Sequence, residues 1–132
     1  MSKTVTAIEV KSGYEPLFKT LHEAAFQASR GKGDERHAGG KAFLDQPIFT
    51  IAREHGLAFL TGQAAKKLGE AHTLLSIFGE ERAIAELYGA IVYTAAAALL
   101  LKEQKANRDA PLLDELPQPA VAPARHCTES LC

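Results

Sequence analysis

A chain of 132 residues holds one domain at most, and its formal net charge of −1 gives it no basic field that would capture nucleic acid nonspecifically. Aliphatic and alanine side chains are abundant, aromatic residues make up 7% of the chain and tryptophan is absent. This composition favours helices packed through small side chains over a sandwich of β-branched strands. The predicted fold class is therefore all-α.

The first elements in chain order are an arm over residues 1–11 and a helix that follows it. Residues 12–15 have the S-x-x-E spacing of a capping box, and Pro16 falls in the first turn, where its missing N–H costs nothing. Apolar residues then recur at intervals of three and four, which predicts an amphipathic helix that ends at the next loop. The arm lacks an apolar segment, so we expect no secretory signal.

The segment with the most chemistry is a glycine-rich basic loop, residues 30–46. Its four glycines free the backbone to turn N–H groups inward, and cations alternate with them just before a helix that should open at Pro47. A helix N-terminus also favours anions. A solvated connector is an equally good interpretation. If the loop binds phosphate, its ligands are Arg30, Lys32, Arg36, His37 and Lys41, with Phe43 packed nearby.

The helix that opens at Pro47 carries an apolar stripe that changes phase beside Gly56. That change predicts either a kink or two packing partners. His55 lies on the stripe and is interpreted as a core residue. Lys66 and Lys67 follow on the same helix, where a solvated face is the default interpretation.

Gly79 separates this helix from another that begins at Glu80 and runs to about Lys105. The two form a long hairpin, so three main helices make up a helical domain over residues 12–107. Residues 108–132 hold four of the six prolines without any period, which predicts a disordered tail. Cys127 and Cys132 in this tail have no second pair to complete a zinc site and are interpreted as thiols of a reducing cytoplasm.

The last helix is apolar on nearly all sides. Three helices of a small domain offer too little surface to cover it, so we predict a homo-oligomer with this alanine-rich helix at the interface. Its uncharged run, residues 87–101, has fifteen residues, fewer than the roughly 20 that cross a bilayer. We therefore expect a cytoplasmic protein with no membrane partner.

The helical glutamates form no E-x-x-E or E-x-x-D pair. Magnesium-dependent hydrolysis of a nucleotide needs several acids aimed at one point, so the pattern argues against in-line phosphate hydrolysis. A hydrolase would have to bring acids together from different helices, and the sequence does not predict that they meet. The candidates are Glu54, Glu70 and Glu86.

Three runs, GKAFLDQP at 40–47, GLAF at 56–59 and GQAAKKLG at 62–69, resemble the N-terminal domain of phage-type dATP/dGTP diphosphohydrolases. The resemblance implies an all-α, phage-encoded protein that handles deoxynucleotides in the host cytoplasm. Gln46, the shortened second half and the missing carboxylate pairs depart from the family's pattern. Four positions of this chain carry over from the family as candidate functional residues. Those positions are Lys41, Asp45, Lys66 and Lys67.

The leading hypothesis is a small helical protein that binds, and in a virus could sequester, a nucleotide or other phosphorylated ligand through the basic loop. It assigns no catalytic residue, no metal and no cofactor. A second hypothesis is a nucleotide pyrophosphohydrolase that uses magnesium. A third is a module that inhibits or recruits a host protein through its helices and tail.

Overall fold

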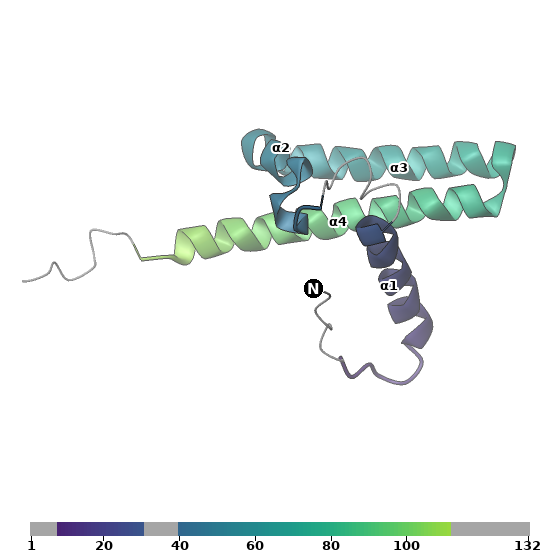
Figure 1. Cartoon of the computed structure of the whole chain (residues 1–132), viewed down its shortest axis with the longest axis horizontal. Coiled ribbons are helices and arrows are strands. Elements are labelled where there is room, and N and C mark those ends of the chain that lie inside the picture. The colour runs from purple at the N-terminus through teal and green to yellow at the C-terminus, as the bar shows by residue number, and fades with distance from the viewer. Residues whose placement is uncertain (1–7, 31–39, 112–132) are drawn as a thin grey trace, which may run out of the picture.

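The structure, a computed structural model, describes residues 8–30 and 40–111 and is all-helical over that part of the chain. A short 3-10 turn, η2, precedes the second of its four α-helices (Figure 1). Residues 8–11 of the predicted arm form neither helix nor strand. The elements are α1 (Glu15–Arg30), η2 (Phe43–Asp45), α2 (Pro47–His55), α3 (Leu57–Phe78) and α4 (Glu80–Asp109).

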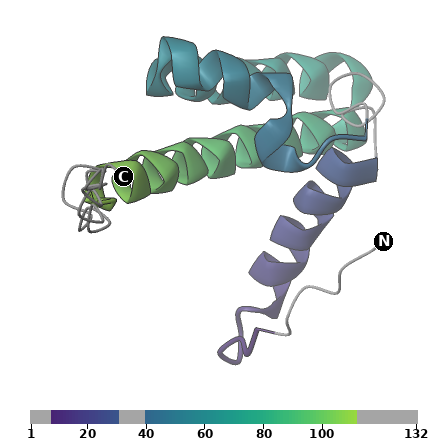
Figure 2. The same ribbon diagram turned by 60° about the vertical axis from the view of Figure 1, so that its left-hand side comes forward.

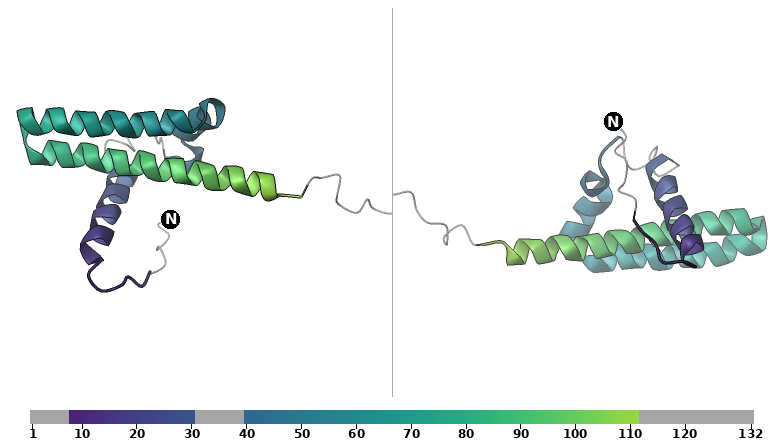
Figure 3. Two further views of the ribbon diagram at one scale, coloured as in Figure 1. Left: turned by 180° about the vertical axis from the view of Figure 1, so that it is seen from behind. Right: turned by 90° about the horizontal axis from the view of Figure 1, so that it is seen from below.

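Helices α3 and α4 form the long antiparallel hairpin that the sequence predicts, and the two lie side by side in Figures 1 and 3. Gly79 joins them with a φ of 86°, a backbone conformation that glycine adopts at little cost. The buried residues along the seam are mostly alanines seven positions apart, which lets the helices approach closely. They are Ala64 and Ala71 on α3, and Ala83, Ala90 and Ala97 on α4.

The predicted single helix after the loop is two helices, so the described chain has four rather than three. The break lies at Gly56, where the stripe changes phase and φ is 85°. The Gly56 N–H still donates to the Ala52 carbonyl at 2.8 Å, which closes the last turn of α2. Phe49 and Ala52 of α2 then pack with Leu60 and Leu100 in the main core.

Helix α1 crosses α4 at a steep angle and extends away from the hairpin (Figures 1 and 2). Gln27 Nε2 donates to the Ala85 carbonyl at 2.9 Å, and the Tyr88 hydroxyl donates to Glu23 at 2.6 Å. The hydrogen bond to Glu23 raises the pKa of Tyr88. Ala24 is the buried residue of α1, so the helix is held at one site and leaves most of its apolar face exposed.

Arg53 ties three elements together at the other end of the hairpin. Its Nε and Nη2 donate to the two Glu103 carboxylate oxygens at 2.9 and 2.8 Å, and Nη2 also donates to the Leu44 carbonyl at 3.1 Å. Its guanidinium lies 5.6 Å from the centre of the Phe49 ring. The hydrogen bond from Arg53 lowers the pKa of Glu103 and raises that of Arg53. The sequence pattern does not indicate this contact between α2 and α4.

Two details differ from the sequence analysis. His55, expected in the core, is an exposed residue at the end of α2, because the break at Gly56 ends the stripe on which it was placed. Helix α4 continues to Asp109, past the predicted end near Lys105 and into the predicted tail. The remainder of that tail, from residue 112 onward, lies outside the described residues.

Helix α4 is also the one helix in residues 8–30 and 40–111 that is long and apolar enough to cross a membrane. An 18-residue window of it has a mean hydropathy of 1.8, and 22% of that window is buried. The core helix of a soluble protein passes the same test of length and composition. A soluble protein is therefore compatible with the structure.

The Arg53–Glu103 pair makes stability depend on pH. Because the pKa of Glu103 lies below its usual 4.5, its contribution is present above that pH and is lost as pH falls through the lower folded-state pKa. We expect the melting temperature, followed by circular dichroism, to fall between about pH 7 and about pH 3, and to fall less in Glu103→Gln. Glu9→Gln, at an exposed position, is the control and should behave as the unmodified protein. Equal falls in Glu103→Gln and the unmodified protein would contradict the assignment.

Candidate functional site

A groove with a volume of about 780 Å³ lies on the hairpin, with α1 at one wall and η2–α2 at the other. Its floor comes from one face of each long helix, because the lining residues recur at helical spacing. Volumes of this size are typical of small-molecule sites. The floor includes Phe59, Gln63 and Lys67 of α3, and Glu86, Gly89 and Tyr93 of α4.

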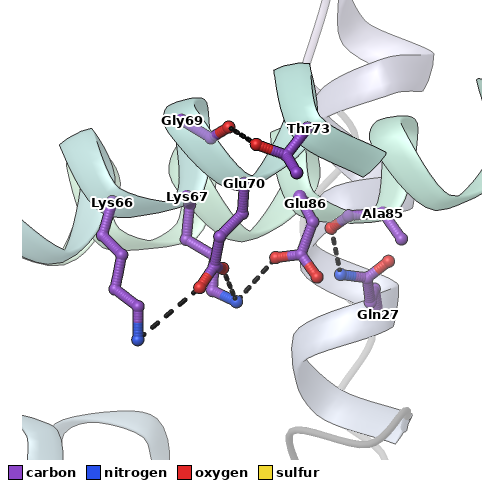
Figure 4. Close-up of polar contacts among 8 residues, drawn as sticks. All are labelled: Gln27, Lys66, Lys67, Gly69, Glu70, Thr73, Ala85 and Glu86. Atoms are coloured by element: carbon purple, nitrogen blue, oxygen red, sulfur yellow. Dashed lines mark hydrogen bonds and ion pairs between the residues drawn. The ribbon is translucent and has the colours of Figure 1, made fainter. Parts of the chain in front are cut away.

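Lys67 and Glu86 of the groove lining belong to a cluster of one ammonium and two carboxylates, of which the second carboxylate, Glu70, lies outside the lining (Figure 4). Lys67 Nζ donates to Glu86 Oε2 at 2.6 Å and to Glu70 Oε2 at 2.9 Å. Lys67 and Glu70 lie three residues apart on α3, whereas Glu86 comes from α4. The cluster therefore links the two helices through charged hydrogen bonds in a half-buried position.

Gly89 makes room for the Lys67 side chain on α4. A Cβ at this position would lie 3.2 Å from Lys67 Cδ, closer than ordinary van der Waals contact. The missing side chain thus gives the Lys67 stem a path across α4 to the carboxylate of Glu86. Glycine in a helix interior costs about 1 kcal/mol relative to alanine, and this contact is a physical reason for its presence.

The charges of the cluster fix its protonation. Partial burial lowers the pKa of Lys67, but the hydrogen bonds to Glu86 and Glu70 outweigh that effect, so the net pKa is raised. The hydrogen bond from Lys67 also lowers the pKa of Glu70. Lys67 is therefore an ammonium at neutral pH, which suits it to pair with the two carboxylates and not to act as a base or nucleophile.

This geometry bears on the hydrolase hypothesis. Glu70 and Glu86 do meet across α3 and α4, which the sequence did not predict. Glu54 does not join them; it lies beside His55, 4.0 Å from its Nε2, in an exposed position. No group of three or more acidic, histidine or cysteine residues able to hold a metal occurs in the described part of the chain. The two carboxylates that converge are paired with the Lys67 ammonium.

The rest of the groove offers flat rings and amides. Phe43, Phe59 and Tyr93 line it, and Phe43 meets Phe49 edge-on, with ring centres 5.1 Å apart. Gln27, Gln46 and Gln63 also line it and supply both donors and acceptors. The Gln27 amide nitrogen is engaged with the Ala85 carbonyl. The groove can therefore stack against a planar group and bind its polar edge.

The predicted ligand-binding residues are distributed unevenly. Of those that the structure describes, Lys67 alone lines the groove, and Lys66 lies beside it with Nζ 3.6 Å from Glu70 Oε1. Arg30 is exposed at the end of α1 with its guanidinium 5.6 Å from the Phe26 ring, and Lys41 and Asp45 are exposed as well. Three further predicted residues lie outside the described residues: Lys32, Arg36 and His37.

The groove nevertheless borders the predicted loop in sequence. Gln27 and Ala28, just before Arg30, line it on one side, and Phe43, just after Lys41, lines it on the other. The two described segments that flank residues 31–39 thus meet at the same groove. From the sequence, the phosphate site was expected in the loop, and of the groove floor only Lys67 was predicted, although the mid-helix Gly89 was an available signal.

Comparisons of the chain with protein-family models, with curated proteins and with solved structures gave no match. The resemblance to phage-type dATP/dGTP diphosphohydrolases stays a prediction from the sequence.

Replacing Lys67 tests the central cluster. Lys67→Met keeps the side-chain length but leaves Glu70 and Glu86 without their cation, and we expect a loss of about 1–3 kcal/mol in the free energy of unfolding. Adding Glu86→Gln should recover part of that loss. Lys66→Met is the matched control, because Lys66 is exposed, and should stay within about 0.5 kcal/mol of the unmodified protein. Urea unfolding measures all three; equal effects of Lys67→Met and Lys66→Met would contradict the cluster's structural role.

Proposed function

We propose that the groove binds a nucleotide or a related phosphorylated small molecule and holds it without hydrolysing it. The observation that carries the proposal is the Lys67 ammonium between Glu70 and Glu86, on the floor of a groove of small-molecule size. Carboxylates that would position magnesium for hydrolysis are committed to this ammonium. Without these carboxylates to position magnesium, the groove is proposed to bind its ligand and not to hydrolyse it.

The rings and amides of the groove suit a nucleobase. Base–aromatic stacking contributes about 1–3 kcal/mol per base in other proteins, and glutamine amides can match the donors and acceptors on a base edge. Gln63 and Tyr93 lie on the floor and Phe43 on the wall, so a planar ligand could contact all three. The proposal assigns base recognition to these residues.

The phosphate of the ligand is assigned to the basic loop. Arg30 and Lys41 flank residues 31–39, and the segments on both sides of that stretch line the groove. A phosphate that extends from a base in the groove toward this connection would meet Arg30, Lys41 and the cations between them. In a phage-encoded protein, as the resemblance implies, binding without turnover would sequester a host nucleotide.

Calorimetry with mono-, di- and cyclic nucleotides tests binding. We expect a measurable heat for at least one class, and Arg36→Ala combined with Lys41→Ala should weaken it about tenfold or more, which corresponds to about 1.4 kcal/mol. Gln63→Leu should weaken the binding of nucleotides but leave the affinity for ribose 5-phosphate, which has no base, unchanged. Lys11→Ala combined with Lys19→Ala removes the same charge at exposed positions outside the groove lining and is the control. No heat with the unmodified protein, or unchanged affinity after the loop substitutions, would contradict the assignment.

If the protein binds its nucleotide without hydrolysing it, we expect no magnesium-dependent release of phosphate or pyrophosphate from dATP or dGTP. The measurement compares release in excess Mg²⁺ with release in a chelator, using protein that calorimetry has shown to bind. Magnesium-dependent release that Glu70→Gln or Glu86→Gln abolishes would instead establish the hydrolase hypothesis.

A specific observation also favours the third hypothesis, binding of a host protein. Tyr14, just before α1, and Leu17 and Leu21 on it are 54%, 54% and 43% exposed, and form an apolar face that residues 8–11 border and no other described helix covers. A single stoichiometric partner that is retained after the loop substitutions and lost after Leu17→Glu with Leu21→Glu would support this function over nucleotide binding.

A further inference from the structure

The hairpin has a second face, on the side away from the groove. Helix α1 and the η2–α2 segment lie toward one side of the hairpin in the right panel of Figure 3. On the other side, a set of positions that we call the free-face stripe recurs at intervals of three and four on both helices. Nine of its twelve residues are apolar, and Thr61, His72 and Thr94 are polar. It comprises Ala58, Thr61, Ala65, Leu68, His72 and Leu75 of α3, and Ile84, Leu87, Ile91, Thr94, Ala98 and Leu101 of α4.

We propose that the free-face stripe binds a second copy of the chain. The two hairpins pack as an antiparallel four-helix bundle in which α4 lies against α4 and α3 against α3 across a twofold axis. Both copies contribute the same surface, so each stripe residue occurs twice in the interface, once from each copy.

The spacing of the stripe is the first argument. Apolar positions that alternate at three and four form the seam of helix bundles and coiled coils, where another helix packs against them. Here both helices of one hairpin carry it on the same side. Their large members are nonetheless half exposed: Leu68 50%, Leu75 49% and Leu101 49%. The hairpin thus presents half of a four-helix bundle.

The sizes of the side chains are the second argument. Residues 92–93 of α4 and 65–66 of α3 are thirteen to fourteen positions from Gly79, and so lie at the same level of the hairpin. A twofold axis there sets Leu87 against the partner's Ala98 and Ile91 against the partner's Thr94. On α3 it sets Leu75 near the partner's Ala58. The Leu87, Ile91 and Leu75 pairs each set a large residue against a smaller one, as close packing requires, whereas the same axis sets Ile84 against the partner's Leu101.

The charges on α4 fix the direction. Glu80 and Glu81 begin the helix, and Lys102 and Lys105 lie near its end. The antiparallel pairing brings the acidic end of each helix to the basic end of its partner, with Glu80 level with the partner's Lys105, whereas a parallel pairing would bring glutamate to glutamate. Lys105 also lies 3.1 Å from Asp109 in an exposed pair, which contributes little by itself.

Light scattering after size-exclusion chromatography tests the dimer. We expect about twice the chain mass of 14.2 kDa for the unmodified protein. Leu87→Glu and Ile91→Glu should each raise the dissociation constant of the dimer about tenfold or more, with helix content by circular dichroism unchanged. Thr73→Glu places the same charge on α3 at an exposed position outside the stripe and should remain dimeric. A 14.2 kDa particle for the unmodified protein, or equal effects of Thr73→Glu and Leu87→Glu, would overturn the proposal.

Charge exchange and spin labels test the direction. Glu80→Lys with Glu81→Lys should weaken the dimer, and Lys102→Glu with Lys105→Glu in the same chain should restore it. A spin label on a cysteine at position 81, with Cys127 and Cys132 replaced by serine, should give a distance between copies of about 35 Å, from 1.5 Å per residue. A distance below about 15 Å would indicate parallel helices and overturn the antiparallel arrangement. A monomer in buffer that sediments with phospholipid vesicles would assign the stripe to a membrane instead.

Discussion

The close packing of α3 against α4 is the constraint on which the rest of the structure depends. Alanines fill most of the seam, so the helices approach closely and their larger apolar residues lie to either side of it. On one side those residues meet α2 and η2 and form the core and the groove. On the other side they form the free-face stripe. Because the two surfaces are on opposite sides of the hairpin, a dimer through the stripe leaves the groove accessible to a ligand.

The Lys67 cluster combines a structural and a chemical consequence in one contact. Gly89 lets the lysine lie across α4, and its ammonium then joins Glu70 of α3 to Glu86 of α4. The same ammonium occupies the position where these two acids converge. The cluster therefore links the two helices of the hairpin and leaves these two carboxylates paired with an ammonium.

Much of the local structure could be predicted from the sequence, because its signals are local. Pro47 opens α2, Glu80 opens α4 after Gly79, and the phase change at Gly56 marks a real boundary. The phase change was equally consistent with a kink and with two packing partners, and it did not predict a break, since periodicity reports which residues share a face and not whether the axis continues. The placement of His55 in the core was wrong for this reason.

The sequence by itself determined that the protein is all-α, where most of its helices begin, and that two long helices form a hairpin. Only the tertiary structure decided that Glu70 and Glu86 meet at Lys67, that Arg53 reaches Glu103, and that α1 and α2 bound a groove on one side of the hairpin. The physical reason is that these contacts join residues from different helices. Whether they meet depends on the level and the distance at which the helices pack, and the period of a single helix records neither.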